Sequence, residues 1–164
     1  MNAHTLNLFI VDDDKLMVAT LKQFLLSKFG KDINIFTYYD GESCLEHVNK
    51  ETDIVILDYN MTGANGLDVL KGIKIINPKT EVIMLSGNED MATAISLFRA
   101  GASDYVLKGE GSWKKLNKLV YHIITAPIRL VVREFGVSKY MAIFMLTFVL
   151  MGLLVVAALQ FMKP

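Results

Sequence analysis

Side chains able to bind a cation or to react stand at the ends of four short apolar runs. They are three consecutive acids, a single acid, a hydroxyl and an ammonium group: Asp12, Asp13, Asp14, Asp58, Ser86 and Lys108. Carboxylates that are crowded together repel one another unless a cation neutralises them. A small set of oxygen ligands with room for water and phosphate is typical of a Mg²⁺ site. If the fold brings the four ends together, these residues predict a Mg²⁺ site.

The same groups favour phosphoryl chemistry. One carboxylate of such a site can act as the nucleophile toward a phosphoryl group. The metal and an ammonium would neutralise the phosphoryl charge, and a hydroxyl would donate to one of its oxygens. A single aspartate after a strand is more often only a helix cap. Four strand ends that all carry the required groups argue for a site.

The elements that must position these groups alternate along the chain. We expect strands at 6–11, 33–36, 53–58, 81–86 and 104–108. Apolar residues at helical spacing predict helices at 15–29, 40–49, 67–76, 90–100 and from Ser112 to a break at Ala126-Pro127. Asp40 and Asp90 are expected to cap two of these helices.

Five strands that alternate with five helices predict an α/β fold with a parallel sheet. The strands read as continuous apolar runs, which fits a sheet covered on both faces. In such a sheet, chemistry gathers at the carboxyl ends of the strands. The reactive side chains stand at those ends, so the fold and the candidate site support each other.

Four segments in order resemble the receiver domain of bacterial two-component response regulators. They are FIVDDD (9–14), VILDYNMTGANGLDVL (55–70), VIMLSG (82–87) and GASDYVLK (101–108). The resemblance covers about residues 5–126 and implies a flavodoxin-like, doubly wound sheet of strand order 2-1-3-4-5. It also implies a signalling phosphoacceptor that assists its own phosphorylation and dephosphorylation, rather than an enzyme.

The resemblance implies a role for each matching acidic position. Asp58 matches the aspartate that accepts a phosphoryl group from a histidine kinase or phosphotransfer protein. Asp13 matches a direct Mg²⁺ ligand, and Asp12 matches one that acts mostly through water. The backbone carbonyl of Asn60 matches the third protein ligand.

The resemblance also implies a switch. Ser86 matches the hydroxyl that bonds to the phosphoryl oxygen, and Lys108 matches the lysine that pairs with the phosphoryl group. Tyr105 matches the aromatic that turns inward when Ser86 moves. The expected output surface is helix 90–100, strand 104–108 and the last helix, with an unknown partner.

Two positions depart from the family pattern. Thr62 stands where the family usually has proline, and we expect this to loosen the loop after Asp58. Gly109 stands where the family usually has proline after the lysine, often with a cis peptide bond. This second change puts the loop after strand 104–108, and the setting of Lys108, in question.

The C-terminal end has a different composition. Tyr140 to Met162 holds 23 residues, of which 20 are apolar and none is charged. A helix of this length spans the ~30 Å hydrocarbon core of a bilayer. We therefore expect a single-pass transmembrane helix at 140–162, with a buried core helix as the alternative.

The charges support a cytoplasmic receiver domain at the inner membrane. Residues 1–110 carry 16 acidic and 10 basic side chains, whereas residues 111–164 carry one acidic and 7 basic side chains. Basic residues before the span agree with an N-terminus in the cytoplasm. The expected domains are a receiver domain at 1–126, a juxtamembrane segment at 127–139 and the span. The juxtamembrane segment is expected either to lie on membrane lipid as an amphipathic helix or to serve as a helical linker.

Three functions are compatible with these features. The chain has equal numbers of acidic and basic residues, 17 each, which does not favour direct nucleic-acid binding. We expect a membrane-tethered response regulator without a further output domain, which switches partner binding when Asp58 is phosphorylated. The alternatives are a phosphate sink or relay for a membrane kinase, and a scaffold that works without phosphorylation. The intact set of reactive residues argues against the scaffold.

Overall fold

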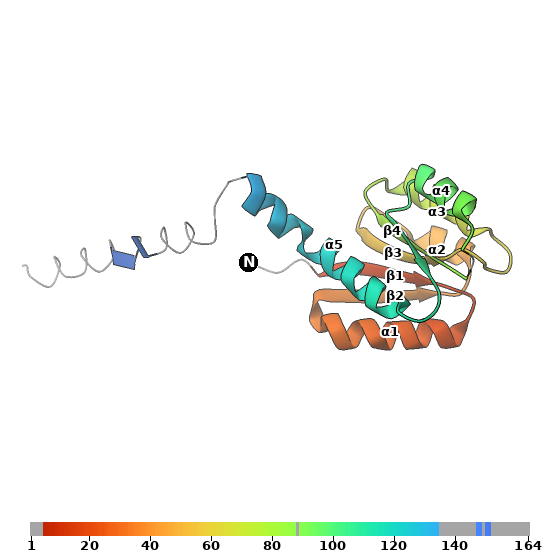
Figure 1. Cartoon of the computed structure of the whole chain (residues 1–164), viewed down its shortest axis with the longest axis horizontal. Helices are drawn as coiled ribbons and strands as arrows, with labels where there is room; N and C mark the ends of the chain where they lie inside the picture. The colour runs from red at the N-terminus through yellow and green to blue at the C-terminus, as the bar shows by residue number, and fades with distance from the viewer. Residues whose placement is uncertain (1–4, 88, 135–146, 149, 152–164) are drawn as a thin grey trace, which may run out of the picture. The chain divides into compact units, whose positions relative to one another are not determined.

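Strands and helices alternate through the first three quarters of the chain. The computed structural model describes residues 5–87, 89–134, 147, 148, 150 and 151. The elements are β1 (Leu6–Val11), α1 (Lys15–Phe29), the short 3-10 helix η1 (Gly30–Asp32), β2 (Ile33–Tyr38), α2 (Gly41–His47), β3 (Thr52–Asp58), α3 (Gly66–Ile76), β4 (Glu81–Ser86), α4 (Met91–Arg99), β5 (Asp104–Leu107) and α5 (Ser112–Glu134) (Figure 1).

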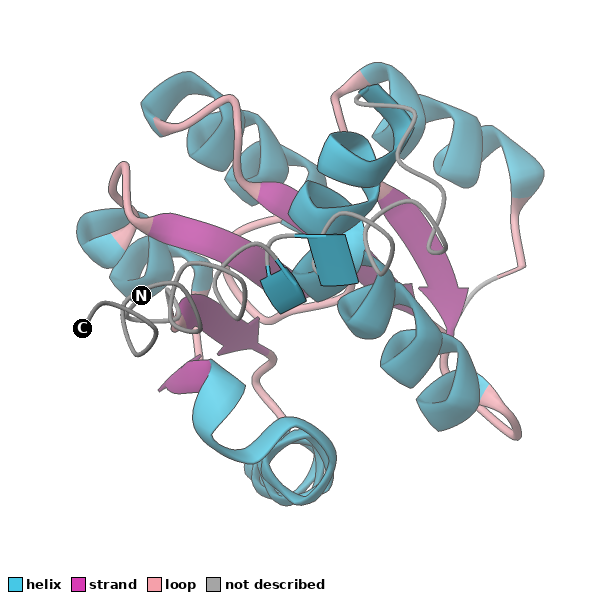
Figure 2. Ribbon diagram, turned by 90° about the vertical axis from the view of Figure 1, so that its left-hand side faces the viewer, coloured by secondary structure: helices cyan, strands magenta, loops and turns pink. Residues whose placement is uncertain are grey.

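The five strands form one parallel sheet in the order β2-β1-β3-β4-β5. The predicted flavodoxin-like fold, strand order and five helices are therefore confirmed. Helices lie on both sides of the sheet (Figure 2). Because all strands are parallel, their carboxyl ends lie along the same edge, and each end continues into a loop there.

Alternate residues of the strands face opposite sides of the sheet. One core cluster joins Val11, Val55 and Met84 of the sheet to Cys44 of α2, Ile73 of α3 and Leu97 of α4. The alternate strand residues, such as Leu8, Ile10 and Ile56, are also fully buried. Val18, Leu21 and Leu25 of α1 and Leu116 and Val120 of α5 supply buried apolar side chains as well. Burial on both faces explains why the strands are apolar at nearly every residue.

Helix caps fix where the chain turns from the site edge into the helices. Asp14 accepts hydrogen bonds from the amides of Leu16 and Met17, and so caps α1. Asp40 and Asp90 cap α2 and α4, as the sequence predicted. Asn65 caps α3. The third of the three consecutive acids is therefore used to start a helix.

The predicted break at Ala126-Pro127 is wrong, because α5 continues to Glu134. A proline removes one helical hydrogen bond, and its ring clashes with the carbonyl of the residue four positions before it. It need not end a helix when the residues on both sides favour helical structure. The helix therefore crosses the predicted boundary between the receiver domain and the juxtamembrane segment.

The chain divides into two compact units, residues 1–123 and 124–164. The first unit contains the whole sheet. The predicted transmembrane helix at 140–162 lies outside the described residues, apart from helical residues 147, 148, 150 and 151. Among the helices that are described, none combines the length and the apolar character that a bilayer crossing requires.

Candidate functional site

The carboxyl ends of four strands deliver the predicted residues to one edge of the sheet. Asp12 follows β1, Asp58 ends β3, Ser86 ends β4 and Lys108 follows β5. Asp12, Asp58 and Ser86 are all buried. The amide of Lys108 donates to the carbonyl of Ser86 at 2.7 Å, which continues the pairing of β4 and β5 into the site. The sheet therefore brings together groups that lie up to 96 residues apart.

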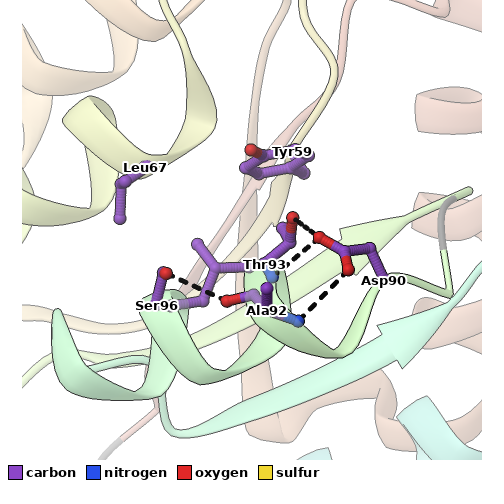
Figure 3. Close-up of a pocket in the computed structure, with 7 residues that line it drawn as sticks. Tyr59, Leu67, Asp90, Ala92, Thr93 and Ser96 are labelled. Atoms are coloured by element: carbon purple, nitrogen blue, oxygen red, sulfur yellow. Dashed lines mark hydrogen bonds between the residues drawn. The ribbon is translucent and has the colours of Figure 1, made fainter.

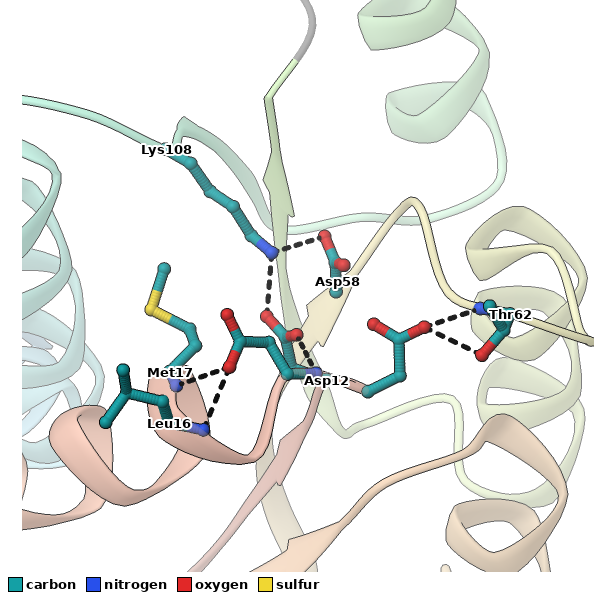
Figure 4. Close-up of polar contacts among 8 residues, drawn as sticks. Asp12, Leu16, Met17, Asp58, Thr62 and Lys108 are labelled. Carbon is teal, nitrogen blue, oxygen red and sulfur yellow. Dashed lines mark hydrogen bonds and ion pairs between the residues drawn. The ribbon is translucent and has the colours of Figure 1, made fainter.

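The Lys108 ammonium joins two buried carboxylates (Figure 4). Its Nζ lies 2.7 Å from Asp12 Oδ2 and 3.0 Å from Asp58 Oδ1. Asp12 also accepts a hydrogen bond from the amide of Asp14 through its other oxygen, Oδ1, at 2.9 Å. Asp12 is thus fixed by two donors, whereas Asp58 depends mainly on the charge of Lys108.

Asp12, Asp13 and Asp58 form what we call the acidic cluster. Each offers a carboxylate oxygen, and these oxygens lie within 4.8 Å of one another. Asp58 Oδ1 is fully buried and receives no hydrogen bond of good geometry from the described residues, although Lys108 lies beside it. Three carboxylates beside one ammonium leave negative charge in excess. A hard divalent cation with oxygen ligands, such as Mg²⁺, fits this set of donors.

The buried position of Asp58 shapes the protonation of the site. Loss of water raises the pKa of Asp58, the negative charge of Asp12 adds to the rise, and Lys108 opposes it. The amide of Asn60 also lowers the pKa of Asp58, which places that residue's backbone beside the carboxylate. Burial opposes the charge of Lys108, but its hydrogen bond to Asp12 and its attraction to Asp58 outweigh that effect and raise its pKa.

Sequence reasoning missed the contact that holds Asp13. The amide and the hydroxyl of Thr62 both donate to Asp13 Oδ2, each at 2.8 Å (Figure 4). These two hydrogen bonds lower the pKa of Asp13. Thr62 was expected only to loosen the loop after Asp58, but it ties this loop to the end of β1. The signal in the sequence was the residue type, since threonine has two donors where proline has none.

A glycine holds the same loop close to Asp58. A Cβ atom at Gly66 would lie 2.6 Å from the carbonyl oxygen of Asp58 and 2.8 Å from the Cα atom of Tyr59. The amide of Gly66 donates to the carbonyl of Tyr59 at 3.2 Å. Only glycine allows the start of α3 to approach the end of β3 this closely. The start of α3, and with it the end of the loop 59–65, is therefore held close to the end of β3.

The predicted switch residues lie on the neighbouring strands β4 and β5. Ser86 is fully buried at the end of β4, and Tyr105 is half-buried on β5, packed against the core on the side of α4. Their backbones belong to neighbouring paired strands. This arrangement links the two positions, while their roles in switching stay predictions.

The loop after Lys108 depends on glycine. Gly109 has a φ of +149° and Gly111 has a φ of +87°, conformations that L side chains rarely adopt. The described residues contain no cis peptide bond. Lys108 still reaches both buried carboxylates. Replacement of the family's usual proline by Gly109 is therefore compatible with the lysine at the site.

A cavity of about 210 Å³ lies between the loop after β3 and α4, lined by Tyr59, Leu67 and residues of α4 (Figure 3). Asp90 caps the helix here. It accepts from the amides of Ala92 and Thr93 and from the Thr93 hydroxyl at 2.7–3.2 Å. The carboxylate of Asp90 thus satisfies donors that a bound anion would need. We therefore interpret this cavity as space into which α4 can move, and not as a binding site for an anion.

Comparison with known families places most of the chain in one of them. The response regulator receiver domain matches residues 8–120. The transcriptional regulatory protein ZraR of Salmonella typhimurium is 32% identical over 104 residues, which are 63% of this chain and 23% of ZraR. The cell cycle transcriptional regulator CtrA of Caulobacter vibrioides is 28% identical over 105 residues, which are 63% of this chain and 44% of CtrA. The chain thus spans about a quarter of the length of ZraR.

Solved structures agree with the sequence comparison. The response regulator DrrB of Thermotoga maritima superimposes with a TM-score of 0.66 at 26% identity, covering 75% of this chain and 54% of DrrB. The CheX–CheY–BeF3–Mg²⁺ complex of Borrelia burgdorferi contains a chain that matches with a TM-score of 0.62 at 26% identity, covering 75% of this chain and 89% of that one.

Proposed function

Because the chain belongs to the response regulator receiver domain family, we propose that it accepts a phosphoryl group on Asp58 and thereby switches its binding to a partner. Receiver domains act as signalling phosphoacceptors in two-component systems and bind Mg²⁺ at an acidic pocket. The observation that carries the proposal is the buried Asp58 Oδ1, which has Lys108 beside it and no good hydrogen bond among the described residues. An oxygen held in this way is available to form a new bond.

The acidic cluster and the carbonyl of Asn60 would hold the Mg²⁺ ion. When bound, this ion supplies positive charge to the carboxylates and to the oxygens of the phosphodonor. Asp58 Oδ1 attacks phosphorus, the new O–P bond forms, and the bond from phosphorus to the donor breaks with its electron pair leaving on the donor. Lys108, now 3.0 Å from Asp58 Oδ1, then pairs with a phosphoryl oxygen.

Phosphorylation would act on β4 and β5 together. A phosphoryl group adds about −1.5 to −2 charge at neutral pH. The Ser86 hydroxyl is drawn toward it, and the loop after β4 moves with Ser86. Lys108 is bonded through its backbone to Ser86, so the end of β5 follows. The half-buried Tyr105 and the cavity beside α4 allow a second packing arrangement of this surface, which phosphorylation would favour.

The proposed output surface is α4, β5 and α5. Met91, Ile95 and Phe98 of α4 are exposed large hydrophobic residues at i, i+4 and i+7, so they lie on one face of the helix. Leu107 at the end of β5 is exposed as well. An apolar helix face of this kind suits a protein partner whose binding depends on the position of α4.

The phosphodonor is proposed to be a histidine kinase or a phosphotransfer protein. Leu16 lies in the first turn of α1, which follows the three consecutive acids, and it is 75% exposed. Together with Phe24 it lines a shallow cavity of about 510 Å³ along α1. An apolar surface on α1, the helix that follows Asp12 and Asp13, would let a helix of the donor bring its phosphohistidine toward the site.

Residues 140–162 are proposed to anchor the chain in the inner membrane, with the receiver domain in the cytoplasm. The proposal depends on the uncharged apolar run and on the basic residues Arg129, Arg133 and Lys139 before it. The juxtamembrane residues would then lie near lipid. Recovery of the full chain in the membrane fraction, resistant to carbonate extraction, tests this point, and recovery in the soluble fraction would contradict it.

Phosphorylation is tested on the full chain, purified with detergent, by intact mass after treatment with a small-molecule phosphodonor. We expect a phosphate-sized mass gain that requires Mg²⁺ and disappears in Asp58→Asn. Asp68→Asn is the matched control, because Asp68 is an exposed carboxylate on α3. A folded wild-type chain that gains no mass would contradict the proposal, and the phosphorylation-independent scaffold would replace it.

A further inference from the structure

Thr62 makes a two-donor contact to Asp13 across 49 residues of sequence. Its amide and hydroxyl both reach Asp13 Oδ2, so one carboxylate oxygen receives both hydrogen bonds and Oδ1 is left for another ligand (Figure 4). Asp13 is only half-buried. A half-buried side chain keeps several rotamers unless a contact restricts it. Thr62 is thus a restraint on a carboxylate of the acidic cluster.

The position in which Thr62 holds Asp13 suits a metal ligand. Mg²⁺ binds oxygen at about 2.1 Å, so opposite ligands lie about 4.2 Å apart. The oxygens offered by the acidic cluster already lie within 4.8 Å of one another. A contraction of this size requires little movement of the loops. Asp13 is therefore held almost where a cation shared with Asp12 and Asp58 would need it.

The contact depends on the residue type at position 62. The backbone amide and the hydroxyl of Thr62 are both donors, and a proline there would have neither. Gly66 keeps the loop that carries Thr62 close to the end of β3. The loop that follows the phosphoacceptor therefore fixes the metal ligand contributed by the end of β1.

We propose that Thr62 is a positioning residue for the metal centre, which orients Asp13 toward Mg²⁺ through hydrogen bonds to the oxygen that does not bind the ion. This inference rests on the proposed function, since it assumes that the acidic cluster binds Mg²⁺. Residues that hold metal ligands in place typically change metal affinity by about 10–100-fold when they are removed. Thr62 is exposed, so we expect its effect at the lower end of this range.

The test is isothermal titration calorimetry of the full chain with MgCl₂. Thr62→Pro removes both donors and should weaken Mg²⁺ binding about tenfold. Thr62→Val keeps the amide and the side-chain shape and should weaken it about threefold. Thr62→Ser keeps both donors and should bind within about twofold of wild type. Thermal unfolding without metal checks that each variant is folded, and Asp13→Asn should abolish binding.

The possible outcomes separate the two proposals. If wild type binds Mg²⁺, Asp13→Asn does not, and the Thr62 variants equal wild type, the role of Thr62 is refuted while the proposed function stands. Tighter binding by Thr62→Pro would refute it too, because Thr62 would then compete with the ion. Equal losses of Mg²⁺ affinity in Thr62→Ser and Thr62→Val would refute a role of the Thr62 hydroxyl in positioning Asp13. A wild-type chain that fails to bind Mg²⁺ overturns both proposals.

Discussion

Buried polar side chains occur at both edges of the sheet, but their charge and their hydrogen-bond partners differ between the two edges. At the amino edge they are Thr52, Asn77 and Thr80, and at the carboxyl edge they are Asp12, Asp58 and Ser86. The first three are neutral, and their side chains are hydrogen-bonded to backbone groups. Two of the second three are carboxylates, and they depend on Lys108, which follows β5.

The amino edge is fully satisfied by hydrogen bonds. The side-chain amide of Asn77 donates to the carbonyls of Asn49 and Thr52 at 3.1 and 3.2 Å. The hydroxyl of Thr80 donates to the same carbonyl of Thr52 at 2.8 Å. These contacts join the start of β3 to the turn that leads into β4. Polar groups of this kind hold loops in place and need no ligand.

The carboxyl edge keeps charge that the protein does not balance. The acidic cluster has three carboxylates, Lys108 supplies one ammonium, and Asp58 Oδ1 receives no good hydrogen bond from the part of the chain that the structure describes. Charged groups in such an environment destabilise the fold until a ligand neutralises them. The difference separates buried polar groups that are satisfied within the protein from carboxylates that, on the proposed function, are kept for a ligand. Three variants test this difference.

Lys108→Met should have the largest effect. It leaves Asp12 and Asp58 buried without their cation, and we expect the free energy of unfolding at pH 7.5 to fall by about 3 kcal/mol. Burial raises the pKa of Asp58 in the folded chain. A proton can therefore replace the ammonium as the pH falls, so the loss should shrink toward pH 5.

Urea unfolding at the two pH values measures this effect. Lys71→Met is the matched control, because Lys71 pairs with Asp68 on the surface of α3 and exposed pairs contribute little. A loss for Lys108→Met that does not depend on pH would mean that the lysine stabilises the fold by packing rather than by charge.

Asn77→Ala should have the next largest effect, at the opposite edge. It removes three side-chain hydrogen bonds, two donated to the carbonyls of Asn49 and Thr52 and one accepted from the amide of Lys79. We expect a loss of about 2 kcal/mol in the free energy of unfolding, with Mg²⁺ affinity and phosphorylation unchanged. Urea unfolding, calorimetry with MgCl₂ and intact mass after phosphodonor treatment measure these three quantities. A clear loss of Mg²⁺ affinity would show that the two edges are not independent.

Asp58→Asn should change stability least, and in the opposite direction. It removes a buried negative charge that repels Asp12, while Lys108 keeps its partner Asp12. We expect a gain of about 1 kcal/mol at neutral pH without metal. The gain should disappear as the pH falls through the raised pKa of Asp58, because the wild-type carboxyl is then neutral as well.

With Mg²⁺ added, wild type should become more stable than Asp58→Asn. A ligand at ten times its Kd stabilises the folded state by about 1.4 kcal/mol, and Asp58→Asn should lose this increment. Thermal unfolding with and without Mg²⁺ measures both effects. A destabilised Asp58→Asn chain would place Asp58 among the structural polar groups, together with Asn77.

Much of the fold follows from local patterns in the sequence. The runs at 6–11 and 81–86 and the helix at 15–29 match the structure to the residue. Strands that are buried on both faces are continuous apolar runs, so their ends are easy to place. The edge strand β2 extends to Tyr38, whereas the sequence predicted its end at residue 36. The prediction stopped short because the half-exposed residues at the end of this strand break the apolar pattern.

The site was predictable in composition but not in all its contacts. Parallel strands place their carboxyl ends at one edge, so the meeting of Asp12, Asp58 and Lys108 followed from the fold. The hydrogen bonds of Thr62 to Asp13 did not, because they depend on the closure of a loop whose shape is set by Gly66. Pro127 predicts a break in the sequence, but its neighbours favour a helix and α5 continues to Glu134.

The backbone hydrogen bond from the amide of Lys108 to the carbonyl of Ser86 also gives access to the rate of a motion. An amide held in this way exchanges its hydrogen with solvent only when the bond opens. Its exchange lifetime therefore measures how often the ends of β4 and β5 separate. Hydrogen exchange of the Lys108 amide thus measures the rate of the β4–β5 movement that the proposed switching requires.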